Sequence, residues 1–520
     1  MKELTISQKD TPVLEDAPAR YTHSEIMVVM SALMLVMLLA ALDQTIVSTA
    51  LPRIARELHG LNKLSWVATA YLLTSAISTP IYGKISDLFG RKKIFQTAIS
   101  IFLVGSVLCG ISQSMNELVF ARALQGIGAG GLMSLVLAIV GDIIPPRQRG
   151  RYMGYFVGVF GVASVAGPLL GGFLTDSLSW RWVFFVNIPL GVIALSAVAT
   201  RLHLPVHKRE HVIDYLGAGL LAASSICLLL ASVWGGTTYA WRSGQIIGLI
   251  TSGVALAAAF IVCEKHASEP IIPLRLFKND IFTVSVILSF LAGIAMFASI
   301  LYVPLYQQVV RGYSPTKSGL LMLPLVIGLL VASITSGRLT SKLGRYKIFP
   351  IVGTLILSFG LWLFSHLTLT TSEWLLGVWM LVIGVGLGSF MQIMTLAIQN
   401  STPRSELGTA TSSATFFRSL GSSFGGAIFG TILISRLALH LRQAFPQGSS
   451  ATTLNISSIQ SGAGLSHLPP GVSRQVFEAF VRSFHEMFLL AVPFALLAFV
   501  AALFLRETPL KGSHEPVAVE

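Results

Sequence analysis

The stretch GKISDLFGRKK, residues 83–93, places five charged side chains among eleven positions of a chain that is only 11% charged. Residues 337–347 repeat it as GRLTSKLGRYK, and the two copies align without a gap. The aligned pairs are Gly83 with Gly337, Gly90 with Gly344, and Arg91 with Arg345. A charged phrase that recurs in an otherwise apolar chain indicates two related halves, each carrying the phrase at the same place.

The composition predicts that this chain is embedded in lipid. Of its 520 residues, 53% are hydrophobic and 11% are charged, whereas a soluble chain carries about 25% charged residues. The net charge of +13 raises the alternative of nucleic-acid binding. We reject that alternative because Lys and Arg occur in short clusters between apolar runs and not along one basic face. The three cysteines also lie inside apolar runs and predict no disulfide framework.

Fourteen apolar runs are long enough to cross the hydrocarbon layer, which takes about 20 residues of helix. They lie near 26–50, 64–83, 94–112, 117–140, 152–174, 182–200, 214–234, 244–263, 281–309, 316–336, 348–367, 374–398, 408–434 and 484–505. The sequence therefore predicts an all-α integral membrane protein with 14 transmembrane helices.

The basic clusters predict the orientation. With the N-terminus in the cytoplasm, the clusters GRKK (90–93), RQRGR (147–151) and GRYK (344–347) all fall in inside loops, as the positive-inside rule requires. The longest connection, 437–483, is then external. It is rich in Ser and Gly and becomes amphipathic at 472–484, which predicts a flexible segment leading into a short interfacial helix.

Each copy of the repeated phrase follows the second span of its half, which is the pattern of two parallel six-helix repeats. The predicted organisation comprises a cytoplasmic tail (1–25), a first repeat (26–200), an inserted helix pair with its linkers (201–280), a second repeat (281–505) and a second cytoplasmic tail (506–520).

Five further phrases carry a resemblance to a known family, and each lies at the expected span. They are LDQTIVSTALPRIA (42–55), RALQGIGAGG (122–131), GVASVAGPLLGG (161–172), SWRWVFFVNIP (179–189) and RSLGSSFGGAIFGT (418–431). With these phrases the chain resembles the fourteen-helix drug:proton antiporter branch of the major facilitator superfamily. The resemblance implies a multidrug exporter that works by alternating access and uses the proton as its coupling ion, without another cofactor.

The residue types of the repeated phrase predict a contact that opens and closes. Gly83 and Gly90 allow a sharp turn and a close helix approach. In the second half Gly337 and Gly344 occupy the same positions, and Arg345 occupies the position of Arg91. Asp87 can accept hydrogen bonds at a helix N-terminus and pair with Arg91 one turn later. The alternative is that the basic residues only hold the loop in the cytoplasm. The second copy has Ser341 in place of Asp87.

Two ionisable residues lie within the predicted spans of the first half. An ionisable group at membrane depth costs roughly 3 kcal/mol and therefore suggests a function. Asp43 lies about 10 Å and Arg122 about 8 Å from the outer ends of their spans, so the two can share a level. An ion pair would keep Asp43 ionised, and loss of the partner would favour its protonation. We expect this switch to couple protons to transport, and the resemblance supports that role. The alternative is a permanent ion pair that only holds two helices together.

The remaining candidates line a predicted cavity or a tightly packed helix. Arg418 lies near the middle of its span, and no acid is predicted at its depth. Its partner could be backbone carbonyls, an aromatic ring or an anionic group, and the sequence does not decide between them. Polar and aromatic residues inside spans suit amphipathic ligands, and those selected are Trp66, Tyr71, Gln125, Tyr155, Asn187, Tyr302, Tyr306, Gln307 and Gln392. Small residues in the fifth span predict close helix packing, namely Gly161, Gly167, Pro168, Gly171 and Gly172.

The expected function is proton-driven export of amphipathic compounds, which we expect to be cationic or neutral, across the plasma (inner) membrane. An exporter of a specific lipid, siderophore or metabolite on the same fold is the alternative. A scaffold would need an appended soluble domain, and direct ATP coupling would need a phosphate loop that the sequence lacks. We expect no enzyme activity and no bound metal. The expected partners are the bilayer and a small substrate, without nucleic acid, and the chain is expected to be a monomer.

Overall fold

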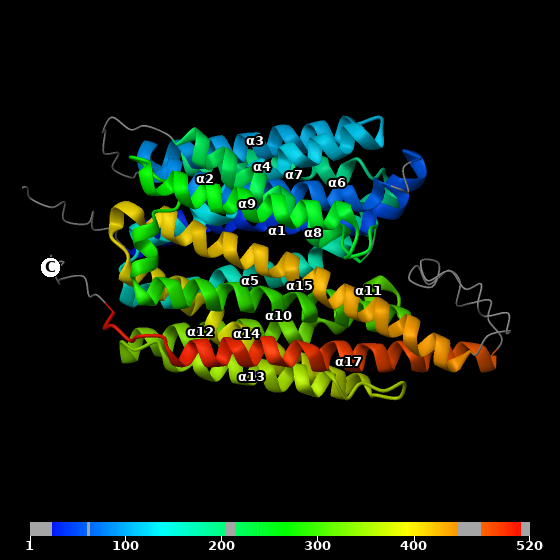
Figure 1. Ribbon diagram of the computed structural model, residues 1–520. Coiled ribbons are helices and arrows are strands. Elements are labelled where there is room, and N and C mark those ends of the chain that lie inside the picture. The colour runs from blue at the N-terminus through cyan, green and yellow to red at the C-terminus, as the bar shows by residue number, and fades with distance from the viewer. Residues whose placement is uncertain (1–22, 60–62, 203–213, 237, 446–469, 511–520) are drawn as a thin grey trace, which may run out of the picture.

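The computed structural model describes residues 23–59, 63–202, 214–236, 238–445 and 470–510 (Figure 1). Within these ranges the chain is almost entirely helical. The helices of the first half are α1 (His23–Glu57), α2 (Leu64–Phe89), α3 (Arg91–Ile111), α4 (Met115–Ile143), α5 (Pro146–Ser177), α6 (Trp182–Phe185) and α7 (Asn187–Arg201). The helices that follow are α8 (Tyr215–Trp234), α9 (Gly244–His266), α10 (Asp280–Val309), α11 (Pro315–Leu321), α12 (Leu323–Leu343), α13 (Ile348–Phe364), α14 (Glu373–Ser401), α15 (Leu407–Ala444) and α17 (Pro470–Leu503).

The described residues include 12 helical segments that are long and apolar enough to cross a membrane. Helix α13, with 17 residues, is shorter and apolar. Helix α2 has 26 residues, contains Pro80, and is not among the twelve. The chain is therefore a multi-pass helical membrane protein. A count of fourteen spans requires α2 and α13 in addition and stays a prediction.

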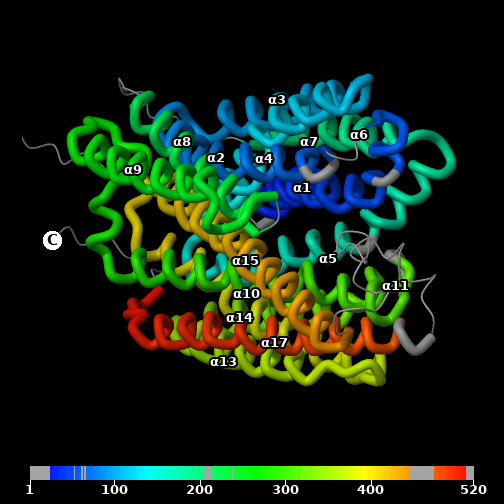
Figure 2. Tube along the Cα trace, turned by 45° about the vertical axis from the view of Figure 1, so that its right-hand side comes forward, coloured from blue at the N-terminus to red at the C-terminus, as the bar shows by residue number. Residues whose placement is uncertain are grey.

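The buried apolar residues form separate cores along the sequence. Two clusters draw only on residues between Ile26 and Leu202, and the largest draws only on residues between Ile281 and Leu510. Figures 1 and 2 show α1–α4 on one side of the molecule and α12, α13, α14 and α17 on the other, with α15 running obliquely between them. We call helices α1–α7 the first bundle and the helices from α10 onward the second bundle.

The two bundles meet chiefly through two helix pairs, α2 with α15 and α5 with α12, and α4 also contacts α15. The inserted helices α8 and α9 pack against one another, and α8 also contacts α2 and α15. Both crossings lie close to the end of the molecule that carries Arg91, Arg147 and Arg345, which we call the basic end. Here Gly83 meets Ser412, and Gly150 meets Gly337.

The region after residue 444 corrects one prediction. Residues 472–484 do not form a short interfacial helix, because they belong to the continuous helix α17, which packs on α10, α13 and α15. The apolar face predicted to lie on lipid is buried in the protein: Val476, Phe480 and Phe484 are at most 2% exposed. An amphipathic face fits a lipid surface or a neighbouring helix equally well. The connection 446–469 lies outside the described residues.

Candidate functional site

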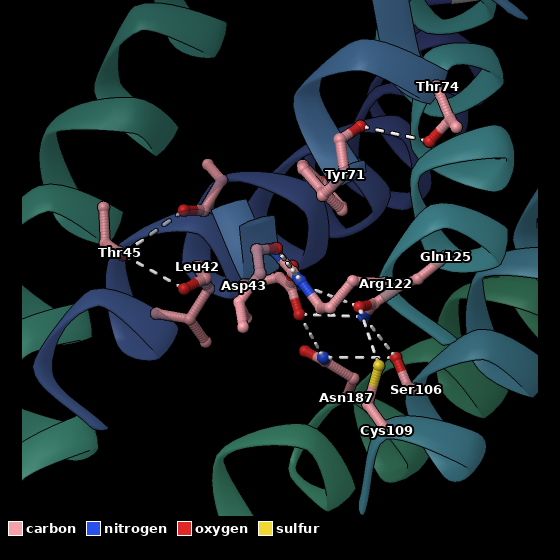
Figure 3. Close-up of polar contacts among 12 residues, drawn as sticks. Leu42, Asp43, Thr45, Tyr71, Thr74, Ser106, Cys109, Arg122, Gln125 and Asn187 are labelled. Atoms are coloured by element: carbon pink, nitrogen blue, oxygen red, sulfur yellow. Dashed lines mark hydrogen bonds and ion pairs between the residues drawn. The ribbon is translucent and has the colours of Figure 1, made fainter. Parts of the chain in front are cut away.

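A fully buried carboxylate lies at the centre of the first bundle. Asp43 of α1 is 0% exposed and accepts hydrogen bonds from three side chains of two other helices, α4 and α7 (Figure 3). Arg122 Nη1 donates to Oδ2 at 2.7 Å, while Gln125 Nε2 and Asn187 Nδ2 donate to Oδ1 at 2.8 and 2.9 Å. The charge-assisted bond to Arg122 and the two amide donors offset the large cost of burying a carboxylate.

Arg122 is as completely engaged as Asp43. Besides the ion pair, its Nη1 donates to Gln125 Oε1 at 2.6 Å and its Nε donates to the Val67 carbonyl at 3.2 Å. The guanidinium carbon also lies 4.1 Å from the centroid of the Tyr71 ring, a cation–π geometry. The pair therefore sits inside a shell of polar and aromatic groups from α1, α2 and α4.

Helix α3 and the break between α6 and α7 complete this network. Ser106 Oγ accepts from Gln125 Nε2 at 2.7 Å and from Asn187 Nδ2 at 3.3 Å. The thiol of Cys109 donates to Gln125 Oε1 at 3.6 Å. Asn187 is the first residue of α7, so the interruption of this span places the amide at the level of Asp43. We call Asp43, Arg122, Gln125, Asn187 and Ser106 the ion-pair network.

The network balances one buried negative charge against one buried positive charge. An ionised Asp43 is balanced by Arg122, whereas a protonated Asp43 would leave the guanidinium without its counter-charge. Gln125 and Asn187 were predicted to line a cavity, and the structure instead places them as donors to Asp43. Sequence reasoning missed Ser106 and Cys109, because a hydroxyl or thiol inside an apolar run is too common to stand out.

The first copy of the repeated phrase joins the two bundles at the basic end. Asp87 of α2 accepts hydrogen bonds from the Gly408 amide at 3.1 Å and the Thr409 amide at 2.7 Å. It also accepts from the Thr409 hydroxyl at 2.6 Å. These amides belong to the first turn of α15 and have no partner within that helix. A carboxylate of one bundle therefore caps a helix of the other.

Arg91 connects this cap to the rest of the first bundle. It forms an ion pair with Asp87, and its Nε donates to Asp142 Oδ2 at 2.7 Å. Its Nη1 donates to Ser86 Oγ at 2.7 Å. Sequence reasoning missed Asp142, which lies in the last turn of α4; its position at the cytoplasmic end predicted for that span was the available signal.

The repeated glycines have matching structural positions. A Cβ atom on Gly83 would overlap Ser412 and the Gly408 carbonyl of α15, and one on Gly337 would overlap the Gly150 carbonyl of α5. Both copies therefore place a helix crossing between the bundles. Gly90 and Gly344 have φ values of 92° and 69°, which side chains rarely adopt.

The second copy lacks the charged part of the first. Ser341 donates to the Gly337 carbonyl of its own helix at 2.9 Å, and its carbonyl accepts from Arg147 Nε at 3.4 Å. Arg345 is exposed, whereas its counterpart Arg91 is buried. The predicted pairing of Arg91 is thus present in one copy, and Arg345 has no equivalent contact among the described residues.

The glycines of α5 face two different helices. Gly167 and Gly171 pack against Thr45 and Thr49 of α1, and Gly161 packs against Val326 of α12. Gly172 faces open space, so its predicted packing role does not apply in this conformation. Pro168 lies within the continuous helix α5.

Most of the other predicted cavity residues lie in packed positions. In the second bundle the hydroxyl of Tyr302 donates to the Gly426 carbonyl at 2.9 Å, and that of Tyr306 to the Thr368 carbonyl at 2.7 Å. Gln307 is buried and accepts from Ser318 at 2.8 Å. These contacts join α10 to α15, to α11 and to the connection between α13 and α14 within one bundle, as core residues do.

The structure does not bring the remaining candidates to the ion-pair network. Trp66 packs edge-on against Trp234 of α8, with ring centroids 5.7 Å apart. Tyr155 is 38% exposed, and Gln392 is partly buried on α14. Arg418 borders a small cavity in the second bundle.

Comparisons with known proteins agree with this architecture. The sequence profile described as Major Facilitator Superfamily matches residues 33–215 and 194–426. An uncharacterized MFS-type transporter of Mycobacterium tuberculosis (strain ATCC 25618 / H37Rv) is 41% identical over 488 residues, covering 94% of this chain and 70% of the relative. The multidrug transporter protein MdtP of Bacillus subtilis (strain 168) is 38% identical over 508 residues, covering 93% of both chains.

Two solved structures show the same fold at low sequence identity. The proton:xylose symporter XylE superposes with a TM-score of 0.61 at 16% identity, covering 94% of this chain and 98% of that chain. The human organic anion transporter MFSD10 superposes with a TM-score of 0.60 at 16% identity, covering 90% of this chain and 99% of that chain.

Proposed function

This chain belongs to the major facilitator superfamily, and from that premise we propose that it is a proton-coupled antiporter that exports amphipathic organic compounds. Relatives that align over nearly the whole chain are named a multidrug transporter and a multidrug resistance protein. One observation carries the proposal: the carboxylate of Asp43 is completely buried and depends on Arg122 for its counter-charge.

The ion pair supplies the proton-coupling step. While Arg122 is in place, Asp43 is held ionised. When the bundles move and Arg122 shifts away, a buried carboxylate favours its protonated form. Binding of a proton from one side and its release to the other would then drive export. Each elementary charge that crosses 100 mV supplies about 2.3 kcal/mol.

Alternating access would follow from movement of one bundle against the other. We assign fourteen spans, counting α2 and α13, with two six-helix repeats related by an axis along the membrane normal. The contacts of Gly83, Gly337 and Asp87 close the molecule at the basic end. We place this end and both termini in the cytoplasm, because basic residues collect there. The membrane is then the plasma membrane, and the transporter acts as a monomer with the proton as its only coupling ion.

Asp43→Asn tests the coupling role. The substitution preserves shape and removes the titratable group, so substrate-induced proton release from purified protein and pH-gradient-driven export in vesicles should both disappear. Asp176→Asn is the matched control, since Asp176 is an exposed aspartate at the end of α5. Normal pH-gradient-driven export by the Asp43 variant would refute proton coupling through this residue.

A further inference from the structure

Arg418 of α15 is a cation that has no partner among the described residues of the second bundle. It lies eleven residues after the start of α15, which places it about 16 Å along the helix. Its guanidinium makes no hydrogen bond or ion pair with any residue of the described ranges. A guanidinium at this depth is costly unless an opposite charge or acceptors satisfy it.

The fully buried arginines of the described ranges all have partners. Arg122 pairs with Asp43, and Arg91 pairs with Asp87 and Asp142. Arg149 donates to the carbonyls of Gly141 and Ile144 instead. Arg418, which is partly exposed, has neither kind of partner among the described residues, and this leaves its guanidinium available to a group from outside this part of the chain.

Arg418 faces a cavity whose walls suit an apolar ligand body. The cavity measures about 10 Å³, is enclosed by α10, α14 and α15, and has no acidic residue in its lining. Its lining includes Ser289, Ala292, Phe390, Met391, Met394 and Thr415. Methionine side chains repack easily around ligands of different shape. A cavity of this volume holds about one water molecule, so a larger ligand requires the walls to move apart.

The backbone of Arg418 is held firmly in this position. A Cβ atom on Gly293 of α10 would overlap the Arg418 carbonyl, so the two helices are in direct backbone contact at this level. The hydroxyl of Ser422 also donates to that carbonyl, at 3.1 Å. The guanidinium therefore projects from a fixed point of the second bundle, which is what a recognition group needs.

We propose that Arg418 is the subsite for the anionic group of an amphipathic substrate. A guanidinium binds a carboxylate or sulfonate through two parallel hydrogen bonds. The apolar body of the ligand would then rest on Phe390, Met391 and Met394. The inference rests on the proposed export function and deepens it, because it extends the accepted cargo to amphipathic anions and zwitterions.

Three probes with one aromatic body and different charges test the subsite. They are the anionic 1-pyrenesulfonate, the neutral 1-pyrenemethanol and the cationic trimethyl(1-pyrenylmethyl)ammonium. Binding to purified full-length protein is followed by pyrene fluorescence. In Arg418→Gln the affinity for the sulfonate should fall by about tenfold or more, which is the usual effect of losing a hydrogen bond to a charged group. The affinities for the other two probes should stay within about twofold.

Two further variants separate recognition from structure. Arg418→Lys retains the charge without the planar fork and should restore part of the preference for sulfonate. Arg442→Gln removes an exposed arginine from the same helix and should leave all three affinities unchanged. The proposal is overturned if wild-type protein does not bind the sulfonate, if Arg418→Gln leaves sulfonate binding intact, or if it weakens all three probes equally.

Export of the same probes, measured in vesicles with a pH gradient, distinguishes the two proposals. If export is intact while Arg418→Gln has no charge-selective effect on binding, the anion subsite is wrong and the exporter stands. If Arg418→Gln selectively weakens sulfonate binding while no probe is exported, the subsite stands and the proposed function is wrong.

Discussion

Asp87 and Thr409 belong to different bundles, and both the amide and the hydroxyl of Thr409 donate to the Asp87 carboxylate, at 2.7 and 2.6 Å. The contact joins the end of α2 to the first turn of α15. Because Arg91 at the start of α3 is paired with the same carboxylate, one acidic side chain connects α2 with α3 in its own bundle and with α15 in the other.

Asp87→Asn should loosen the closed arrangement of the basic end. The amide loses the charge that favours the α15 N-terminus and the ion pair with Arg91. Ser412→Cys introduces a thiol at a fully buried position that faces Gly83. We expect a thiol-reactive reagent to label this cysteine severalfold faster in the Asp87→Asn protein than in the protein that retains Asp87. The measurement uses a background in which the three native cysteines are replaced by serine. Equal labelling in the two backgrounds would show that the cap does not hold the bundles together.

Gly337→Ala should destabilise the protein although alanine favours helices by about 1 kcal/mol over glycine. The added methyl group would overlap a backbone carbonyl of Gly150, which cannot rotate away. Overpacking of this kind costs about 1–3 kcal/mol, so the thermal midpoint in detergent should fall. Gly172→Ala is the control, because Gly172 faces open space; its midpoint should stay equal or rise. A Gly337 variant as stable as the control would contradict the close crossing.

Asn187→Ala should destabilise the packing around Asp43. The substitution removes one of the three donors to the buried Asp43 carboxylate, and leaving a buried polar group without a hydrogen bond costs about 1–3 kcal/mol. We expect the thermal midpoint in detergent to fall. Asn116→Ala, at an exposed asparagine of α4, is the control and should leave the midpoint unchanged. An Asn187 variant as stable as the control would mean that the amide does not support Asp43.

Much of the architecture could be predicted from the sequence because a membrane imposes simple rules. Every one of the fourteen predicted apolar runs overlaps a helix of the structure, since about 20 apolar residues have few alternatives in lipid. The family was recognisable from six short phrases, and the sequence profile confirms it. Asp43 and Arg122 were found because charge at depth is rare.

The direction in which a side chain points was the harder problem. Gln125 and Asn187 look like ligand contacts in the sequence, yet they serve Asp43. Tyr302 and Tyr306 look similar in sequence and bind backbone carbonyls instead. The sequence shows whether a side chain is polar. Which group it contacts depends on how each helix is rotated about its own axis relative to helices that are distant in the chain.

The unequal copies of the repeated phrase have a mechanical consequence. At the crossing of α5 and α12 the contacts are uncharged packing, from the backbones of Gly150 and Gly337 to Gly161 against Val326, with a 3.4 Å hydrogen bond from Arg147 to the Ser341 carbonyl. At the crossing of α2 and α15 the bundles are bound by a charged cap. If the bundles separate at this end, the charged cap between α2 and α15 has to break. The uncharged contact between α5 and α12 can then serve as the hinge about which the two bundles rotate.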